Sequence, residues 1–547
     1  MKKLGRLVFL LFKYALLLVC LAIAPLLIYQ QFATEFWFRY WMLIMAPMIA
    51  ILLLIIWYLV FGNAKVGTRF KRMGFLLLGI VVASFVFRFL FVYDGSTSGG
   101  SMPKYKFRFS STETDEASEV AVVEPETART DVPVPEGVID SPRFLGPKGD
   151  GVWPDPIASF DFSQNPPEEL WRQPIGEGWS SYAVVGGRAI TQEQRGDDEL
   201  VTCYELVSGE LLWAHTDPDS RFTKSAEMSV EAVMGGEGPR STPTVHGQRV
   251  FSLGSTGILN CLDLQTGENI WTQNVIADFG AGLPKWGKSA GPLVIEEHNL
   301  VVVTGPESSP APKGKPDTYR GPTLIAFALD SGEPVWEYEG TGASYSSPRL
   351  IDLAGETQLV SVNGRNVTGH DPATGDEKWR FDWPGPFPKV GQPIEAGDDR
   401  VLVSASYSVG SYLLQIREDE GSWTVEPVWK STRLKTKFSS AIIHEGIAYA
   451  LNEGRLTCVN METGKAIWRA PSGKYGFGQN LLVGDQLLIQ AEEGDVAIVE
   501  TNPEEFVETA TVDALSAMTW NTPTLAGRYL LVRNGEEAVC YKLAAKK

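Results

Sequence analysis

The chain contains 547 residues, of which 44% are hydrophobic and 21% charged, and it carries a formal net charge of −18. The charge is unevenly spread: residues 1–95 hold ten Lys/Arg and two acids, a balance of +8, whereas residues 96–547 hold 38 Lys/Arg and 64 acids, a balance of −26. Nucleic acid is excluded as a partner of so acidic a segment, because neutralisation of phosphates by Lys and Arg supplies most of that affinity. The length and apolar content allow one large folded domain with appendages.

Three long apolar runs come first in the chain, at about residues 8–30, 41–61 and 74–93. Each is close to the roughly 20 residues that a helix needs to cross a bilayer. The sequence therefore predicts a membrane module over residues 1–94 with three transmembrane helices. A cleaved signal peptide is the alternative for the first run, but two further runs follow it and no small-x-small cleavage site is clear.

Basic residues flank the apolar runs unequally. Lys2, Lys3 and Arg6 precede the first run, and a second group lies between the second and third runs, namely Lys65, Arg69, Lys71 and Arg72. By the positive-inside rule both regions are cytoplasmic. Three spans then place the rest of the chain outside, which predicts a multi-pass inner (cytoplasmic) membrane protein with an extracytoplasmic domain, in the periplasm if the cell is Gram-negative. Residues 95–140 are rich in Gly, Ser, Thr, Glu and Pro and predict a flexible acidic linker.

Beyond residue 200 one template recurs: a small residue, alternating apolar positions, a Thr/Ser-Gly turn, three residues and Trp. The clearest copies are CYELVSGELLW (203–213), CLDLQTGENIW (261–271), AFALDSGEPVW (326–336), GHDPATGDEKW (369–379) and CVNMETGKAIW (458–468). The Gly supplies the positive φ that a tight reversal of two strands needs. Because the apolar residues are spaced by two, each copy is a pair of antiparallel strands and not part of a helical repeat.

Looser copies extend the repeat to eight aromatic positions, which are Trp171, Trp213, Trp271, Trp336, Trp379, Trp429, Trp468 and Phe506. Their period fits a four-stranded blade of roughly 40–50 residues. The sequence therefore predicts an all-β fold, an eight-bladed β-propeller over residues 141–547. The last blade, residues 520–543, has three strands, so we expect residues 169–173 to supply the fourth and close the ring without an open edge.

The cysteines and histidines show no spacing typical of a metal or catalytic site. Four cysteines occupy equivalent positions in different blades: Cys203, Cys261, Cys458 and Cys540. These positions are too far apart for disulfides, so we expect the four cysteines to be small buried packing residues. The histidines do not converge, and no HExxH or CxxC motif is present. The sequence thus predicts no catalytic residue and no metal site.

A candidate ligand- or partner-binding site lies where each blade begins its first strand, because these positions surround one mouth of the central channel. The residues there are aromatic, basic or amide: Trp179, Arg240, Trp286, Lys288, Tyr345, Phe387, Lys389, Lys437, Phe438, Phe477, Trp520 and Asn521. Four cations in an acidic domain attract a carboxylate or phosphate, and the rings offer faces to a planar ligand or a sugar. The alternative is that the aromatics plug the channel and the cations offset nearby acids.

The repeat, with blades that begin SSP or STP, resembles the PQQ-binding-like propeller repeat family, which includes quinoprotein alcohol dehydrogenases and BamB-like scaffolds of outer-membrane protein assembly. The resemblance covers about residues 140–545 and extends to FLGPKGDGVWP (144–154), PKWGKSAGPLV (284–294) and the blade start YSSPRL. It implies a propeller. Quinoproteins of this kind hold PQQ beneath adjacent cysteines and beside a calcium ion, with an Asp base. This chain has no Cys-Cys pair, and the calcium ligands and base do not map onto it.

Three functions are consistent with these features. The first, which we favour, is a membrane-anchored, non-enzymatic scaffold or binding module for envelope proteins or polymers, with no cofactor. The second is a PQQ-dependent oxidoreductase, which would bind PQQ with calcium at the channel mouth. The third is a carbohydrate-binding or sensor module, which needs an exposed aromatic patch.

Overall fold

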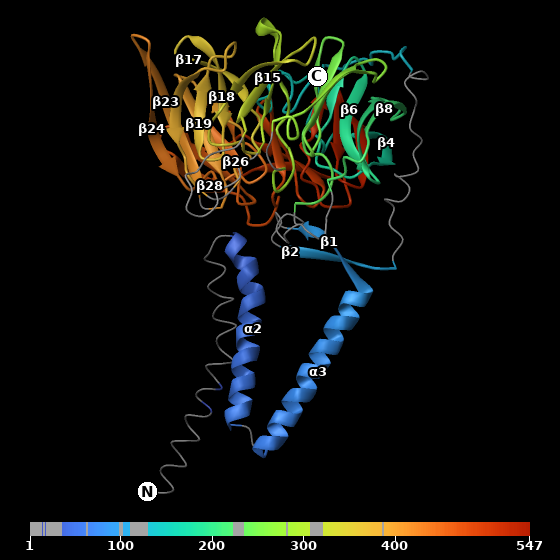
Figure 1. Cartoon of the computed structure of the whole chain (residues 1–547), viewed down its shortest axis with the longest axis vertical. Coiled ribbons are helices and arrows are strands. Elements are labelled where there is room, and N and C mark those ends of the chain that lie inside the picture. The colour runs from blue at the N-terminus through green and yellow to red at the C-terminus, as the bar shows by residue number, and fades with distance from the viewer. Residues whose placement is uncertain are drawn as a thin grey trace. The chain divides into compact units, whose positions relative to one another are not determined.

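The computed structural model describes residues 14, 17, 36–61, 64–97, 102–109, 129–222, 235–279, 283–306, 321–385, 388–407 and 409–546. The chain divides into two compact units, Met1–Ser111 and Thr112–Lys547. The first holds helices and one hairpin, and the second holds the remaining strands (Figure 1).

The first unit contains the helices α2 (Phe36–Phe61) and α3 (Val66–Leu90), followed by the antiparallel strands β1 (Phe91–Thr97) and β2 (Met102–Phe107). Among the described residues, α3 is the one helix that is long and apolar enough to cross a membrane. In α2 the qualifying apolar stretch, Met48–Phe61, is shorter. Apart from residues 14 and 17, the first predicted span lies outside the described residues. The third span ends at Leu90 and not at residue 93, because the chain there turns into β1.

The second unit is a ring of eight sheets, each built around four antiparallel strands in meander order, and the sheet of blade seven has a fifth strand. Blades one to four are β5 (Ala183–Val185), β6 (Arg188–Arg195), β7 (Asp198–Glu205), β8 (Leu211–Asp217); β9 (Thr244–His246), β10 (Arg249–Leu253), β11 (Ile258–Asp263), β12 (Asn269–Asn274); β13 (Leu293–Ile295), β14 (Leu300–Thr304), β15 (Leu324–Ala328), β16 (Pro334–Tyr338); and β17 (Arg349–Leu353), β18 (Glu356–Val362), β19 (Asn366–His370), β20 (Glu377–Asp382). A short 3-10 turn, η2 (Glu296–His298), joins β13 to β14.

Blades five to eight are β21 (Ile394–Glu395), β22 (Arg400–Ala405), β23 (Gly410–Asp419), β24 (Ser422–Ser431); β25 (Ile442–His444), β26 (Ile447–Asn452), β27 (Arg455–Asn460), β28 (Lys465–Arg469); β29 (Gln479–Val483), β30 (Gln486–Gln490), β31 (Asp495–Glu500), β32 (Glu508–Asp513); and β33 (Thr524–Ala526), β34 (Tyr529–Arg533), β35 (Glu537–Lys542) with β4 (Glu168–Pro174). The eight-bladed propeller is confirmed. So is its closure, because β4 pairs with β35 and places Trp171 opposite Cys540.

A β-bulge between the third and fourth strands recurs in all eight blades and explains the repeated Trp. The residue that follows the extra residue of the bulge is Trp in seven blades, and in most of them its ring packs against the next blade. Trp213, for example, donates from Nε1 to the Leu264 carbonyl at 3.0 Å. The turn Gly267 lies against the same ring: its φ is +74°, and a Cβ there would meet the ring at 2.5 Å. In five blades the turn Gly lies against the Trp of the preceding blade in this way. Trp379 of blade four is the exception: it donates to Gln358 of its own blade, and Gly421 of blade five has open space around it.

Blade seven departs from the predicted pattern. Phe506 precedes β32, and the residue in register with the Trp positions is Ala510, opposite Ile498. Phe506 therefore does not replace Trp; it packs beside Trp468 of blade six, with ring centroids 5.8 Å apart. The predicted packing role of the cysteines is confirmed, since Cys203, Cys261, Cys458 and Cys540 are all free and buried. Burial raises the pKa of the Cys261 thiol to about 12.

Residues 141–153 run along the inside of the ring. Ser141 pairs with Val184 of β5, and the Pro142 carbonyl accepts a hydrogen bond from the Val245 amide of β9 at 2.8 Å. At the other end of the segment β3 (Val152–Trp153) adds to blade seven, parallel to β29. The segment therefore contacts the first strands of blades one, two and seven.

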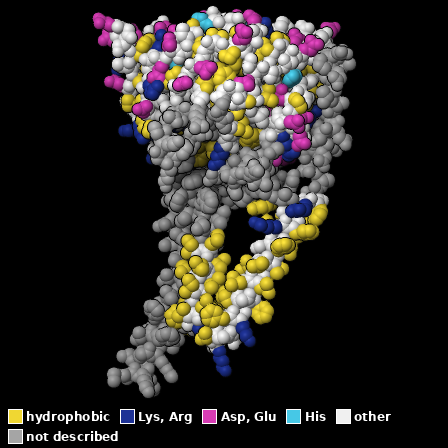
Figure 2. All heavy atoms as spheres, in the orientation of Figure 1, with side chains coloured by type: hydrophobic (Ala, Val, Ile, Leu, Met, Phe, Trp, Pro, Cys, Tyr) yellow, Lys and Arg dark blue, Asp and Glu magenta, His cyan; other side chains and the backbone are white. Residues whose placement is uncertain are grey.

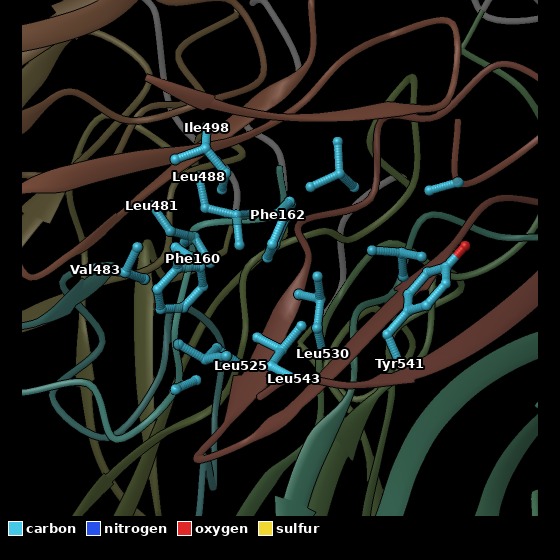
Figure 3. Packing of buried hydrophobic residues seen from close by; sticks show 14 of the residues in the cluster. Phe160, Phe162, Leu481, Val483, Leu488, Ile498, Leu525, Leu530, Tyr541 and Leu543 are labelled. Carbon is cyan, nitrogen blue, oxygen red and sulfur yellow. The ribbon is translucent and has the colours of Figure 1, made fainter. Parts of the chain in front are cut away.

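The chain then inserts two aromatic rings between the last two blades. Phe160 and Phe162 pack into one hydrophobic cluster with side chains of blades seven and eight (Figure 3), among them Leu481, Leu488, Leu525, Leu530 and Leu543. This packing, like the β4 pairing, ties residues before the first blade to the end of the ring.

The segment predicted as a flexible linker, residues 95–140, contains regular contacts at both ends. Its first part belongs to the β1–β2 hairpin. Its last part lies on the propeller: the Thr130 carbonyl accepts a hydrogen bond from Arg188 at 2.6 Å, and Val132 is buried. Composition did not predict these contacts because the partners are far away in the sequence.

Candidate functional site

The predicted site residues lie immediately before the first strands of the blades, and these strands line the ring's interior. Neighbouring first strands contact one another, β5 with β9 and β33, β9 with β13, and β25 with β29. The residues that precede them therefore gather at one end of the channel. Phe387 lies outside the described residues.

The structure brings four of the aromatic residues into one cluster of tilted and edge-to-face ring contacts. The Trp179 and Trp520 ring centroids are 4.8 Å apart, and those of Trp520 and Phe438 are 4.6 Å apart. Phe477 continues the series at 6.2 Å from Phe438. These residues come from blades one, eight, six and seven, so the cluster joins four blades across the mouth. We call it the aromatic cluster.

A second aromatic contact lies in blades three and four. Trp286 and Tyr345 meet edge to face with centroids 5.6 Å apart. The Trp286 amide also points at the Tyr345 hydroxyl at 3.4 Å.

The predicted lysines are buried, and two of them donate to backbone carbonyls of the protein. Lys288, Lys389 and Lys437 are 1–3% exposed. The Lys288 ammonium donates to the Thr304 carbonyl at 2.8 Å and to the Gly305 carbonyl at 2.6 Å. Lys389 donates to the Gly364 carbonyl. Lys288 thus ties the start of blade three to the end of β14, the second strand of the same blade, and Lys389 ties the start of blade five to the turn after β18 of blade four.

Lys437 lies within the aromatic cluster. Its ammonium is 4.4 Å from the Phe477 ring centroid and 5.0 Å from that of Tyr407, distances at which a cation is attracted to an aromatic face. Burial lowers the pKa of Lys437 to about 8, although the carboxylates of Glu453 and Glu492 act in the opposite direction. Burial likewise lowers the pKa of Lys389 to about 8.

Arg240 and Asn521 are also bonded to the protein's own backbone. The Arg240 guanidinium donates to the carbonyls of Gly238 at 2.7 Å and Gly236 at 2.8 Å, and it stacks over Phe222. Burial lowers the pKa of Arg240 to about 10. Asn521 donates to the Ser180 carbonyl at 2.8 Å and so fastens blade eight to blade one.

A sequence profile of a family described as outer membrane protein assembly factor BamB matches residues 162–279 and 197–470, which together span more than half of the chain. The chain belongs to this BamB-like family. A curated relative, the outer membrane protein assembly factor BamB of Burkholderia pseudomallei, is 22% identical over 318 residues, covering 53% of this chain and 81% of the relative.

Solved structures that resemble this BamB-like chain share its fold at low sequence identity. The quinohemoprotein alcohol dehydrogenase of Comamonas testosteroni matches with a TM-score of 0.52 and 11% identity, covering 80% of this chain and 85% of the enzyme. A europium-containing methanol dehydrogenase matches with a TM-score of 0.50 and 11% identity, covering 78% and 92%. These matches establish the PQQ-type propeller and nothing further about activity.

Carboxylates that sequence reasoning missed organise the mouth of this BamB-like propeller. Glu492 accepts hydrogen bonds from the Phe477 amide at 3.1 Å and from Trp520 Nε1 at 2.9 Å, so it holds two members of the aromatic cluster. Glu453 accepts from the Ser406 hydroxyl at 2.8 Å. Both follow the apolar second strand of a blade, just before a Gly turn. An acidic residue at that position of the repeat is the sequence feature that could have identified them.

Blade one contributes two more buried carboxylates. Glu193 accepts from Tyr204 and Thr202 and pairs with Arg195, and these positive and hydrogen-bonding neighbours lower its pKa despite complete burial, which acts to raise it. Glu199 accepts from the Ser255 amide at 2.8 Å, and burial raises its pKa to about 7. Within the described residues no three or more His, Cys, Asp and Glu side chains are grouped in a way that could hold a metal.

The residues at the mouth thus connect neighbouring blades to one another. A cradle for the carboxylates of PQQ needs cationic groups that face the channel, whereas the ammonium groups of Lys288 and Lys389 donate to carbonyls inside the protein. These two lysines therefore do not supply the cations of such a cradle.

Proposed function

We propose that this chain is a membrane-anchored, extracytoplasmic propeller that acts as a non-enzymatic scaffold for envelope proteins. Its BamB-like relatives are named as outer membrane protein assembly factors, which supports a protein partner in the cell envelope. The partner class is therefore envelope proteins during their assembly, in preference to nucleic acid, a sugar polymer or a redox substrate.

The observation that carries this proposal is a set of exposed apolar residues at one repeated position. The extra residue of the bulge, just before the Trp of strand four, is Ile270, Val335, Val428 and Ile467 in blades two, three, five and six. These side chains are 44%, 53%, 49% and 45% exposed. We call them the bulge row. Apolar residues repeated at the outer edges of blades favour contact with another protein.

The packing in blade one is evidence that the partner binds the bulge row through an extended segment. There the equivalent bulge residue, Leu212, is 1% exposed. It belongs to the same hydrophobic cluster as Val132, which comes from the irregular segment that precedes the ring. A segment of the chain itself thus contributes to the apolar region that contains the bulge residue of blade one. We propose that segments of other proteins cover the exposed members of the bulge row.

The proposal also includes a membrane anchor with three spans. The helix α3 has the length and composition of a span. We propose that it crosses the inner membrane together with spans at about residues 8–30 and 41–61, which gives three in all. The basic residues between the last two spans, Lys65 and Arg69 among them, then face the cytoplasm by the positive-inside rule, and the propeller faces the periplasm.

Capture of the full chain from membranes tests the scaffold. We expect the native chain to retain specific envelope proteins and a variant with Ile270→Lys, Val335→Lys, Val428→Lys and Ile467→Lys to lose them. Lys is tolerated at this position, because blade four carries Lys378 at its own bulge. The control replaces three exposed apolar residues elsewhere, Val134, Ile139 and Ile157, by Lys. An unchanged set of captured proteins in the bulge-row variant would contradict the proposal.

A further inference from the structure

The hairpin β1–β2 is fastened directly to the end of α3. The Arg108 amide donates to the Leu90 carbonyl at 2.7 Å, and the Arg108 guanidinium donates to the Arg88 carbonyl at 3.1 Å. Phe87 of the helix stacks on Phe91 with centroids 4.8 Å apart and meets Tyr105 of β2 edge to face at 5.1 Å. The end of the helix and the hairpin are therefore one packed structure.

The sequence of β2 and its continuation alternates basic and aromatic residues. Residues 104–109 read Lys-Tyr-Lys-Phe-Arg-Phe. Because successive residues of a strand lie on opposite faces, this order places Lys104 and Lys106 on one face of β2 and Tyr105 and Phe107 on the other. Arg108 and Phe109 follow in the turn after the strand. Tyr105, Phe107 and Phe109 are 47%, 43% and 62% exposed although they contact other rings. Between residues 88 and 109 the chain has one acidic residue, Asp94.

A two-stranded hairpin of this kind is marginally stable in water by itself. Its exposed rings need an apolar environment and its basic residues need anionic partners. Both are present where a bilayer meets water, since aromatic side chains concentrate at that depth and Lys and Arg are attracted to anionic headgroups. Hydrophobic side chains cover α3, which ends where the hairpin begins (Figure 2).

We propose that the β1–β2 hairpin is a lipid-binding element that lies in the headgroup layer, with its aromatic face toward the acyl chains and Lys104, Lys106 and Arg108 bound to anionic phospholipid. The proposal rests on the membrane attachment argued above. It adds a binding surface and a ligand class, anionic phospholipid in the bilayer that α3 crosses, which the scaffold role alone does not require.

Hydrogen exchange of the full chain in nanodiscs tests this inference. One set of discs contains phosphatidylcholine alone and the other contains phosphatidylcholine and phosphatidylglycerol. We expect the amides of residues 102–109 to exchange at least about tenfold more slowly in the anionic discs, because each basic residue gains attraction near such a surface. Added salt should reduce this difference, since it screens the attraction.

Two variants test the basic face and the aromatic face of the hairpin independently. Lys104→Glu with Lys106→Glu and Arg108→Glu should remove the difference between the two disc types. Phe107→Ser with Phe109→Ser should increase exchange in both. The matched control reverses three exposed basic residues of the propeller, Arg417, Arg433 and Lys465, and should leave exchange of the hairpin unchanged.

Equal exchange of the hairpin in the two disc types for the native chain would overturn the inference. So would protection that appears only in native membranes with other proteins present, since the hairpin would then bind a protein. Rapid exchange of α3 in the discs would overturn the membrane attachment as well. A protected α3 with an unprotected hairpin would overturn this inference alone and leave the scaffold proposal intact.

Discussion

Single turn glycines allow a Trp ring of one blade to pack against the next blade. Gly267 has a φ of +74° and lies against the Trp213 ring, whereas Gly421, in the equivalent turn of blade five, has a φ of +84° and open space around its Cβ position. We expect Gly421→Ala to lower the free energy of unfolding by about 1 kcal/mol, the cost of a left-handed backbone. Gly267→Ala should cost about 3 kcal/mol, because the methyl group also displaces the ring.

Denaturant unfolding of the two Gly variants measures both costs. The comparison is matched because the backbone strain is shared and only the ring contact differs. Equal losses in the two variants would contradict the role that we assign to the packing of Trp213 on Gly267.

The buried carboxyl of Glu199 makes stability depend on pH. Burial raises its pKa from 4.5 to about 7. Between these two values the folded state holds a proton that the unfolded state has released, so the contribution of this group to stability falls as pH rises from about 4.5 to about 7. Glu199→Gln does not titrate, and we expect the variant to gain stability relative to the native protein across that window, by at most about 1.4 kcal/mol per pH unit. A difference independent of pH, measured by denaturant unfolding, would refute this.

At the residue scale, sequence reasoning identified where the mouth lies but not what its side chains do. Trp179 and Trp520 meet there as the repeat predicts. The direction of a lysine is not encoded by repeat position, because its long stem can reach either the channel or the protein interior. Lys288 reaches inward, since Thr304 and Gly305 offer carbonyls at the end of β14.

At the scale of elements, the closure of the ring depends on one strand from before the first blade. Arg172 of β4 pairs with Glu537 of β35 at 2.6 Å and donates to the Ala514 carbonyl at 3.0 Å. We expect Arg172→Glu to reduce stability by about 1–2 kcal/mol, because it places like charges together at a partly exposed position. Hydrogen exchange should rise in β4 and β35 first.

Arg417→Glu is the control for this prediction. Arg417 forms an exposed pair with Glu426 in the long β23–β24 hairpin, where we expect an effect within about 0.5 kcal/mol. Exchange in β4 that is the same in both variants would contradict the closing role of Arg172.

The strands could be predicted because their apolar residues recur with a regular period. Each blade repeats the alternation of apolar residues and ends at a Gly turn, so the eight sheets and the strand at 169–173 were predicted from the sequence. The segment at 141–153 was not placed, because it has no periodicity and its partners, Val184, Val245 and β29, are far away in the sequence. Phe506 was misassigned because the turn before β32 differs from the template.

At the scale of the whole molecule, the fold is shared by enzymes and by assembly factors, and only the side chains distinguish them. The mouth of this ring contains the aromatic cluster, and two of its four predicted cations, Lys288 and Lys389, donate to backbone carbonyls. We therefore expect calorimetric and visible-absorption titration of the full chain with PQQ and calcium to show no saturable binding. Saturable one-to-one binding would contradict this and would favour the oxidoreductase.

The central claim is that the bulge row holds other proteins, and site-specific photocross-linking in intact cells tests it most directly. A photoreactive residue at Val335 should yield discrete adducts with envelope proteins. Thr509 is the matched position, because it is the exposed but polar bulge residue of blade seven, and it should yield none. Adducts at position 335 and not at 509 are the predicted result. The same adducts at both positions, or none at any member of the bulge row, would contradict the account.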